Sequence, residues 1–337
     1  MATILNQSKQ NFRAIGFVNE TNLVREDCEI KLENGSKEQG ERIRGKVSVR
    51  MGNNIKTFDV FCNNITTKGD ESKQWKNALS WLELNPEIGG NPDIAPSVVM
   101  VNGRVTENRY FNENTKDVSV ALRWTASRIS TSRVTEEDEQ GCTLSGNFYI
   151  NSIKPETKDD EETGRLLVGL CGVQYGASPF IVNAVVDEDL AETFTDMYEI
   201  GQTASFDIDV VFEHIGNKAE GKKAFGGGGK IKSTGYDREI LMIVGGDAPI
   251  EESEEEDDDG NLIDNGYIDP KAMKSALKER ANAIAEIKAN GGTTDTVSNK
   301  SSNLREKKRT MGKKATPVVE DDDDDDDDDD PFSDDDF

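Results

Sequence analysis

The chain has 337 residues, of which 31% are charged, and its formal net charge at pH 7 is −26. This length favours two folded domains with tails. The charge is uneven: residues 1–134 hold 19 Lys and Arg against 16 Asp and Glu, residues 135–250 hold 9 against 22, and residues 251–337 hold 12 against 28. A polyanionic partner is therefore expected to bind the mildly basic first third of the chain.

Neither a membrane protein nor a zinc protein is indicated. No apolar stretch is long enough to span a bilayer, and the first residues, MATILNQSKQNF, lack the apolar core of a signal peptide. We therefore expect a cytoplasmic protein without a membrane partner. The cysteines Cys28, Cys62, Cys142 and Cys171 form no CxxC pair, which is typical of buried free thiols. No metal or cofactor is predicted.

Up to about residue 250, the sequence alternates with a period of two between Gly and Asn turns, as β-strands do. Many short strands at close spacing predict a mainly β fold, either a barrel or a sandwich. The predicted strands are 43–51, 55–62, 98–106, 117–126, 147–153, 166–173, 180–186, 205–213 and 239–244.

Two domains are expected in this β region. The first is 1–134, with a helix at about 71–84, in which apolar residues recur at helical spacing. The second is 135–250, in which strands flank a short acidic segment at 187–199 that resembles a helix. The similar layout predicts a structural repeat of the first domain.

The composition changes after residue 250. A charged linker, 251–314, contains a predicted helix at 270–289, with Asp269 as its cap and Pro270 in its first turn. This helix could mediate self-association. A basic segment follows at 300–314. The last part, 315–337, is a run of aspartates that we expect to be disordered, because like charges repel and little is apolar.

The segment 42–51 predicts a strand with two different faces. Ile43, Val47 and Val49 alternate with basic side chains, and successive side chains of a strand point to opposite faces. One face is therefore core and the other is a cationic stripe. A solvated surface without a ligand is the alternative.

The next strand adds an aromatic ring to this face. Phe58, Val60 and Cys62 occupy alternate positions of the strand, so their side chains point to the same face. We expect that face in the core and Phe61 on the outside. An outward ring beside cations is a platform on which nucleic-acid bases stack. The alternative is that Phe61 packs beneath a loop.

The segment 98–129 holds an apolar strand, Gly103-Arg104, then Arg109-Tyr110, a charged turn and a second strand. This layout resembles the long hairpin of bacterial single-stranded DNA-binding proteins. The resemblance implies an OB-fold, a five-stranded barrel that binds oligonucleotides. Trp124 shares the parity of apolar neighbours and could instead be core. The candidate DNA-binding residues are Arg42, Arg44, Lys46, Arg50, Lys56, Phe61, Arg104, Arg109, Tyr110, Phe111, Arg123 and Trp124.

The acidic end of the chain strengthens the resemblance. Single-stranded DNA-binding proteins of bacteria and tailed bacteriophages carry acidic tails that end in Phe and bind partner proteins. The matching residues here are Phe332, Asp334, Asp335, Asp336 and Phe337. The resemblance implies a bacteriophage protein in the cytoplasm of a bacterial host cell, acting in DNA replication, recombination and repair. The tail is expected to compete with DNA for the basic face and to recruit replication or recombination proteins.

Other functions fit the sequence less well. The glycine-rich segment 221–231 lacks the spacing of a phosphate-binding loop, and His214 has no triad partner, so no enzyme is predicted. The main alternative is an acidic nucleic-acid mimic or chaperone-like protein that binds basic partners. The basic strand at 42–51 disfavours that alternative. The preference for DNA over RNA stays open.

Overall fold

The computed structural model describes residues 5–134, 136, 139–158, 161–215, 236–253 and 264–291. The described residues divide into two compact units, one within 5–108 and 120–280 and the other within 109–119 and 281–291. The fold is mainly β, as predicted. The strands are β1 (Gln10–Thr21), β2 (Val24–Lys31), β3 (Lys37–Met51), β4 (Asn54–Asn63), β5 (Val98–Asn112), β6 (Asp117–Thr131), β7 (Gly141–Lys158), β8 (Glu161–Gln174), β9 (Ser178–Val186), β10 (Thr203–Ile215) and β11 (Tyr236–Gly246).

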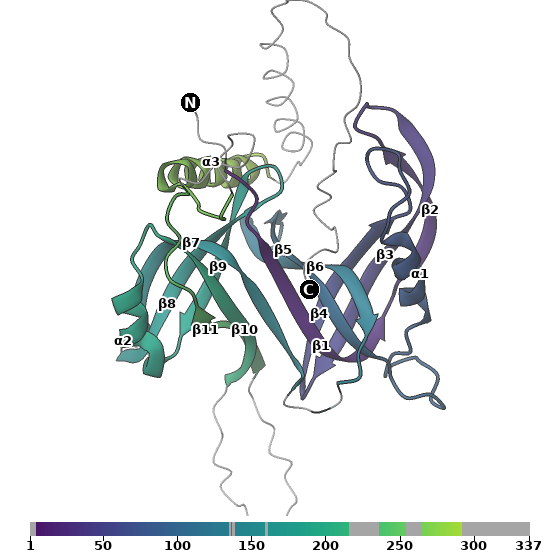
Figure 1. The fold of residues 1–337 in the computed structure, drawn as a ribbon, viewed down its shortest axis with the longest axis horizontal. Coiled ribbons are helices and arrows are strands. Elements are labelled where there is room, and N and C mark those ends of the chain that lie inside the picture. Colours follow the sequence, from purple (N-terminus) through teal and green to yellow (C-terminus); the bar gives the residue numbers. More distant parts are fainter. Residues whose placement is uncertain are drawn as a thin grey trace, which may run out of the picture. The chain divides into compact units, whose positions relative to one another are not determined.

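The first five-stranded barrel closes in the order β1-β3-β4-β6-β5-β1 (Figure 1). The parallel pair is β4 with β6, where Asp59 lies opposite Thr125. The extra strand β2 extends the sheet beyond β3. Helix α1 (Trp75–Ser80) and a 3-10 turn at Trp81–Glu83 lie between β4 and β5, within the helix predicted at 71–84.

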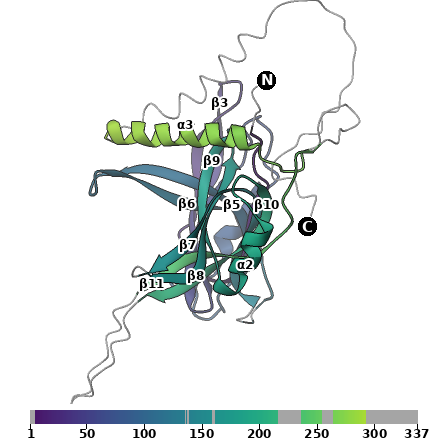
Figure 2. The ribbon, with the colours of Figure 1, turned by 90° about the vertical axis from the view of Figure 1, so that its left-hand side faces the viewer.

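The second barrel repeats this order as β7-β8-β9-β11-β10-β7. Its parallel pair is β9 with β11, and α2 (Glu188–Met197) lies between β9 and β10. Figure 2 shows α2 beside β8, where its Phe194 is buried in the core. Each barrel is a five-stranded Greek-key ring with one helix after its third strand, which confirms the expected OB-fold and OB-like repeat. The domain boundaries at 134 and 250 stay a prediction.

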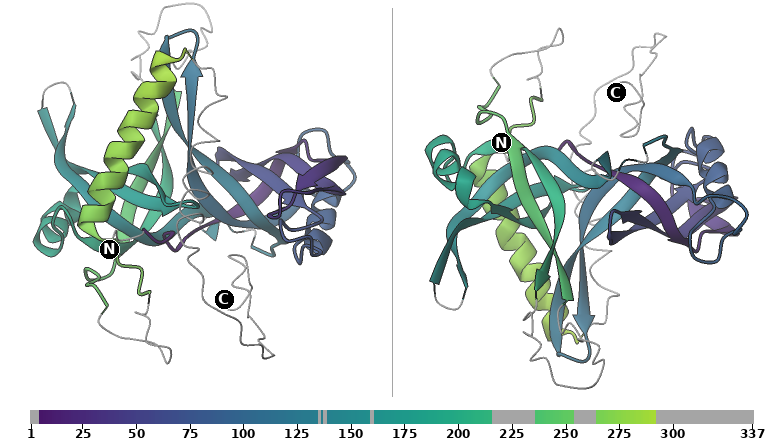
Figure 3. Two further views of the ribbon diagram at one scale, coloured as in Figure 1. Left: turned by 90° about the horizontal axis from the view of Figure 1, so that it is seen from above. Right: turned by 90° about the horizontal axis from the view of Figure 1, so that it is seen from below.

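Strand β1 belongs to both barrels (Figures 1 and 3). Residues 12–17 pair with β5 along one edge, while on the other edge 10–15 pair with β7 and 17–21 pair with β3. The alternation predicted no strand before residue 43, so neither β1 nor β2 was expected. The reason is physical: the segment Ala14–Asn19 is largely buried on both faces, so it lacks the polar–apolar alternation of a half-exposed strand.

The core of the first barrel contains a cluster of aromatic rings. Phe12 of β1 stacks on Phe58 of β4 with 5.0 Å between ring centroids, and Trp124 of β6 meets Phe12 edge-on at 5.2 Å. Phe12 lies opposite Gly103 of β5, where a Cβ atom would stand only 2.7 Å from the ring. The Gly103-Arg104 pair noted in the sequence is therefore required, at its glycine, by the packing of the core.

Helix α3 (Pro270–Ala289) has the bounds predicted from the sequence. Asp269 caps it, because its Oδ1 accepts a hydrogen bond from the backbone N–H of Lys271 at 3.0 Å. Met273 is fully buried in a small second core with Tyr149 and Cys171. None of the described helices is both long and apolar enough to cross a membrane. All four cysteines are free thiols, and three of them are buried.

Candidate nucleic-acid interface

The outer face of the first barrel carries the predicted basic stripe. Ile43, Val47 and Val49 of β3 point into the core, and the basic side chains between them point outward, as the alternation predicted. We define the outer face as Glu26 of β2, Arg42, Arg44 and Lys46 of β3, Asp59 and Phe61 of β4, and Arg123 of β6.

Phe61 is the aromatic centre of the outer face. Its side chain is 50% exposed, whereas Phe58, Val60 and Cys62 are buried, as predicted. Arg44 lies directly opposite Phe61 in the β3–β4 register and opposite Val24 in the β2–β3 register. Across the sheet, Arg44 therefore lies between two exposed apolar residues, Val24 and Phe61.

Carboxylates neutralise part of this positive charge. Glu26 binds both Arg42 and Arg44 at 2.7 Å, and these two hydrogen bonds hold the pKa of its carboxyl below the usual range. Asp59 binds Arg123 at 2.7 Å and lies 3.9 Å from Lys46. Four cations thus share two carboxylates, which leaves the outer face with a surplus of two positive charges.

The sequence did not reveal this pairing. Glu26 lies on β2, a strand that lacks clear alternation and was not predicted. Asp59 is a lone acid on β4, and its two partners come from the strands on either side. Only the order of the strands in the sheet shows that each carboxylate lies next to two cations.

Arg50 forms a different cluster at the end of β3. It forms hydrogen bonds with both carboxylate oxygens of Glu87, the shortest at 2.6 Å, and its guanidinium stacks 4.9 Å from the ring centroid of Phe17. This contact lowers the pKa of the Glu87 carboxyl. Arg50 therefore stabilises the β1–β3 junction in addition to any contact with a ligand.

Lys56 and Trp124 point inward rather than toward the outer face. Lys56 is 4% exposed, pairs with Glu239 of β11 at 2.7 Å, and holds its amino group 3.8 Å from the centroid of the Trp124 ring. Trp124 is 6% exposed, which confirms its alternative assignment to the core. Lys56 was predicted to contact DNA because of its charge, but it lies on the same face of β4 as Phe58 and Val60, and that face is buried.

The remaining predicted residues lie elsewhere. Arg104 of β5 is half-buried, and burial lowers the pKa of its guanidinium. Arg109, Tyr110 and Phe111 belong to the smaller unit, in which Tyr110 is exposed and Lys288 pairs with Asp117 at 3.0 Å. The lysine-containing segment 221–231, the basic segment 300–314 and the tail 315–337 with Phe332, Asp334, Asp335, Asp336 and Phe337 lie outside the described residues.

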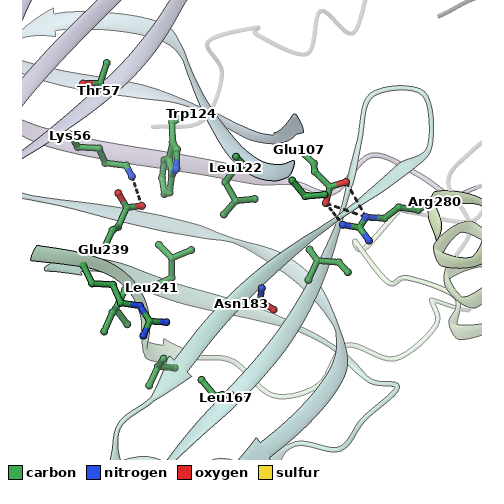
Figure 4. A pocket seen from close by; sticks show the side chains of 16 residues that line it. Lys56, Thr57, Glu107, Leu122, Trp124, Leu167, Asn183, Glu239, Leu241 and Arg280 are labelled. Carbon is green, nitrogen blue, oxygen red and sulfur yellow. Dashed lines mark hydrogen bonds and ion pairs between the residues drawn. The ribbon is translucent and has the colours of Figure 1, made fainter. Parts of the chain in front are cut away.

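A groove of about 700 Å³ runs between the two barrels, and no pattern in the sequence indicated it. One wall comes from β4, β5 and β6, the other from β8, β9 and β11, and Arg280 of α3 closes one part. Two ion pairs, Lys56–Glu239 and Arg280–Glu107, lie on either side of Leu122, Leu241 and Asn183 (Figure 4).

Comparison with known proteins finds one matching family model and several solved structures with low similarity to this chain. The YorF family model matches residues 18–290. No curated protein sequence matches the chain. Among solved structures, the chain is similar to the wild-type single-stranded DNA-binding protein from Thermus aquaticus, with a TM-score of 0.41 and 9% identity over 75% of this chain and 98% of that one.

Two further structures are less similar. A deletion mutant of the same Thermus aquaticus protein gives a TM-score of 0.37 and 10% identity over 74% of this chain and 99% of that one. A replication protein A heterotrimer bound to single-stranded DNA gives 0.18 and 10% identity over 61% of this chain and 45% of that one.

The ion pair between the buried Lys56 and the exposed Glu239 should contribute measurably to stability. We expect Lys56→Met to lower the free energy of unfolding by about 2 kcal/mol, because a hydrogen bond to a charged group is lost. The exposed pair Lys46–Asp59 provides the control, and Lys46→Met should cost about 0.5 kcal/mol or less. Urea denaturation measures both, and equally small losses would show that the Lys56–Glu239 pair does not stabilise the junction of the barrels.

Proposed function

The chain belongs to the YorF family, and from its outer face we propose that it binds single-stranded DNA with little sequence preference. The observation that carries this proposal is Phe61, half exposed and directly opposite Arg44, on a surface with two surplus positive charges. A base stacks on the ring whatever its identity, while the arginines bind the phosphates on either side.

The position of this face supports the proposal. Counted around the first barrel from β1, β3 and β4 are its second and third strands. OB-folds bind oligonucleotides on the face formed by these two strands. Phosphates of the nucleic acid have to displace the carboxylates of Glu26 and Asp59 from the basic side chains. Binding should therefore be strongly sensitive to salt, with a slope of about −0.7 in log K per phosphate contact.

We further propose the cellular role that the sequence resemblance implied. The protein coats DNA that is exposed in replication, recombination and repair, as a bacteriophage protein in the cytoplasm of its host. The acidic tail returns to the basic face in the absence of DNA and presents Phe337 to partner proteins when DNA displaces it. The role is that of a binding module and not of an enzyme.

Removing the exposed ring should weaken DNA binding. We expect Phe61→Ala to lower the affinity for oligo-dT about tenfold, within the range of about 1–3 kcal/mol that a stacked base contributes. Tyr175→Ala, which removes an exposed ring on the β8–β9 turn, serves as the control and should change little. Fluorescence anisotropy with oligo-dT, duplex DNA and RNA gives the affinities, and duplex should bind more weakly because its bases are already stacked.

An absence of binding to any of these probes would overturn the proposal. It would favour the alternative of an acidic protein that binds basic partners.

Releasing two arginines from their shared carboxylate should have the opposite effect. In Glu26→Gln, phosphates no longer compete with a carboxylate, so affinity for oligo-dT at low salt should rise roughly threefold. Glu29→Gln makes the same change in net charge on the same strand, but its carboxylate binds Lys37 outside the outer face. Equal gains in the two variants would show that net charge alone, and not the outer face, controls binding.

Removal of the tail tests the competition. A chain that ends at residue 314 should bind oligo-dT more tightly than the full chain at low salt. The difference should vanish near 1 M salt, where the Debye length falls to about 3 Å. Titrations at several salt concentrations measure this, and identical affinities at low salt would limit the tail to partner recruitment or solubility.

A further inference from the structure

The groove between the barrels has the chemistry of a ligand site that the outer face does not explain. Its walls combine apolar with charged side chains, and two of the apolar wall residues, Val120 and Leu167, are 42% and 39% exposed although they face a concave surface. Small-molecule sites are typically grooves of about 300–1,000 Å³ with apolar walls and a few polar groups, and they are common where domains meet.

The polar groups of the groove fall into two classes. The first class consists of two ion pairs, Lys56–Glu239 and Arg280–Glu107, in each of which the cation and the carboxylate neutralise one another. Asn183 of β9 and Arg238 of β11 are exposed, and their side chains make no hydrogen bond or ion pair with any residue that the structure describes. One amide and one guanidinium therefore remain available to a ligand.

The charge of the groove favours an anion. Lys56, Arg238 and Arg280 face two carboxylates, Glu107 and Glu239, so the lining has a net charge of +1 although the whole chain has −26. Because the ion pairs are internally balanced, Arg238 supplies the available positive charge. A guanidinium binds phosphate oxygens in a fixed fork geometry.

We propose that this groove binds one nucleotide of a single strand, as a second site that rests on the proposed function. The base contacts the exposed apolar side chains of Leu167 and Val120, Asn183 bonds to the edge of the base, and Arg238 binds the phosphate. A carboxamide carries both a donor and an acceptor and can turn over, so it can pair with any of the four bases. The site therefore adds affinity without sequence preference.

Two groove variants test this with different signatures. Arg238→Gln removes one phosphate contact, so the slope of log K against log salt for oligo-dT should become shallower by about 0.7. Asn183→Leu removes a neutral hydrogen bond, so affinity should fall roughly two- to tenfold while the slope stays unchanged. Lys154→Gln and Asn151→Leu alter exposed residues of β7 outside the groove and serve as matched controls.

The outcomes separate the groove from the outer face. Binding that is weakened by Phe61→Ala but unchanged by both groove variants would overturn the groove site and leave the proposed function intact. A wild-type chain that does not bind oligo-dT would overturn both. Binding that depends on Asn183 and Arg238 with the two expected salt slopes supports the groove, whatever the effect of Phe61→Ala.

Discussion

The change of partner along β1 is the constraint on which the rest of the architecture depends. On one edge of β1 the neighbour changes from β7 to β3 at Gly16, between the register pairs of Ile15 and Phe17. A Cβ atom at Gly16 would lie 2.2 Å from the carbonyl oxygen of Arg50, so only glycine allows β3 to approach there. This one exchange joins two barrels through a continuous strand, and the wall of the groove and the position of Lys56 opposite Glu239 follow from it.

The basic side chains of the outer face are already paired with carboxylates, so an anionic ligand has to replace these ion pairs. A chain with a net charge of −26 repels polyanions at long range, so local arrangement has to provide the attraction. Glu26 and Asp59 each hold two cations at once, which keeps the side chains in place without neutralising them fully. Such shared carboxylates position the basic groups and at the same time compete with a bound anion, which would suit the reversible binding of single-stranded DNA that we propose.

Much of the fold could be predicted because, along a half-buried strand, apolar residues alternate with polar ones and the apolar ones are buried. This alternation correctly separated the inward Val60 from the outward Phe61 and gave all nine strands from β3 onward, and capping residues fixed the bounds of α3. It failed at β1, where both faces are buried and alternation disappears. It also failed for the candidate site wherever partners are distant in sequence: Lys56 and Glu239 are separated by 183 residues, and only the closed sheet brings them together.

The two barrels show how one strand order can produce two different surfaces. The second and third strands of the first barrel, β3 and β4, present arginines and an exposed ring to solvent. The corresponding strands of the second barrel, β8 and β9, carry Leu167, Ile181 and Val185, and these side chains line the groove instead. Backbone topology therefore selects which strands can meet a ligand, while the outward residues and the neighbouring barrel decide its chemistry. A strand held on the outer face and in the groove would be bound by two different kinds of contact: phosphate contacts, on the outer face and at Arg238, which weaken with salt, and contacts of the base with Leu167, Val120 and Asn183, which do not.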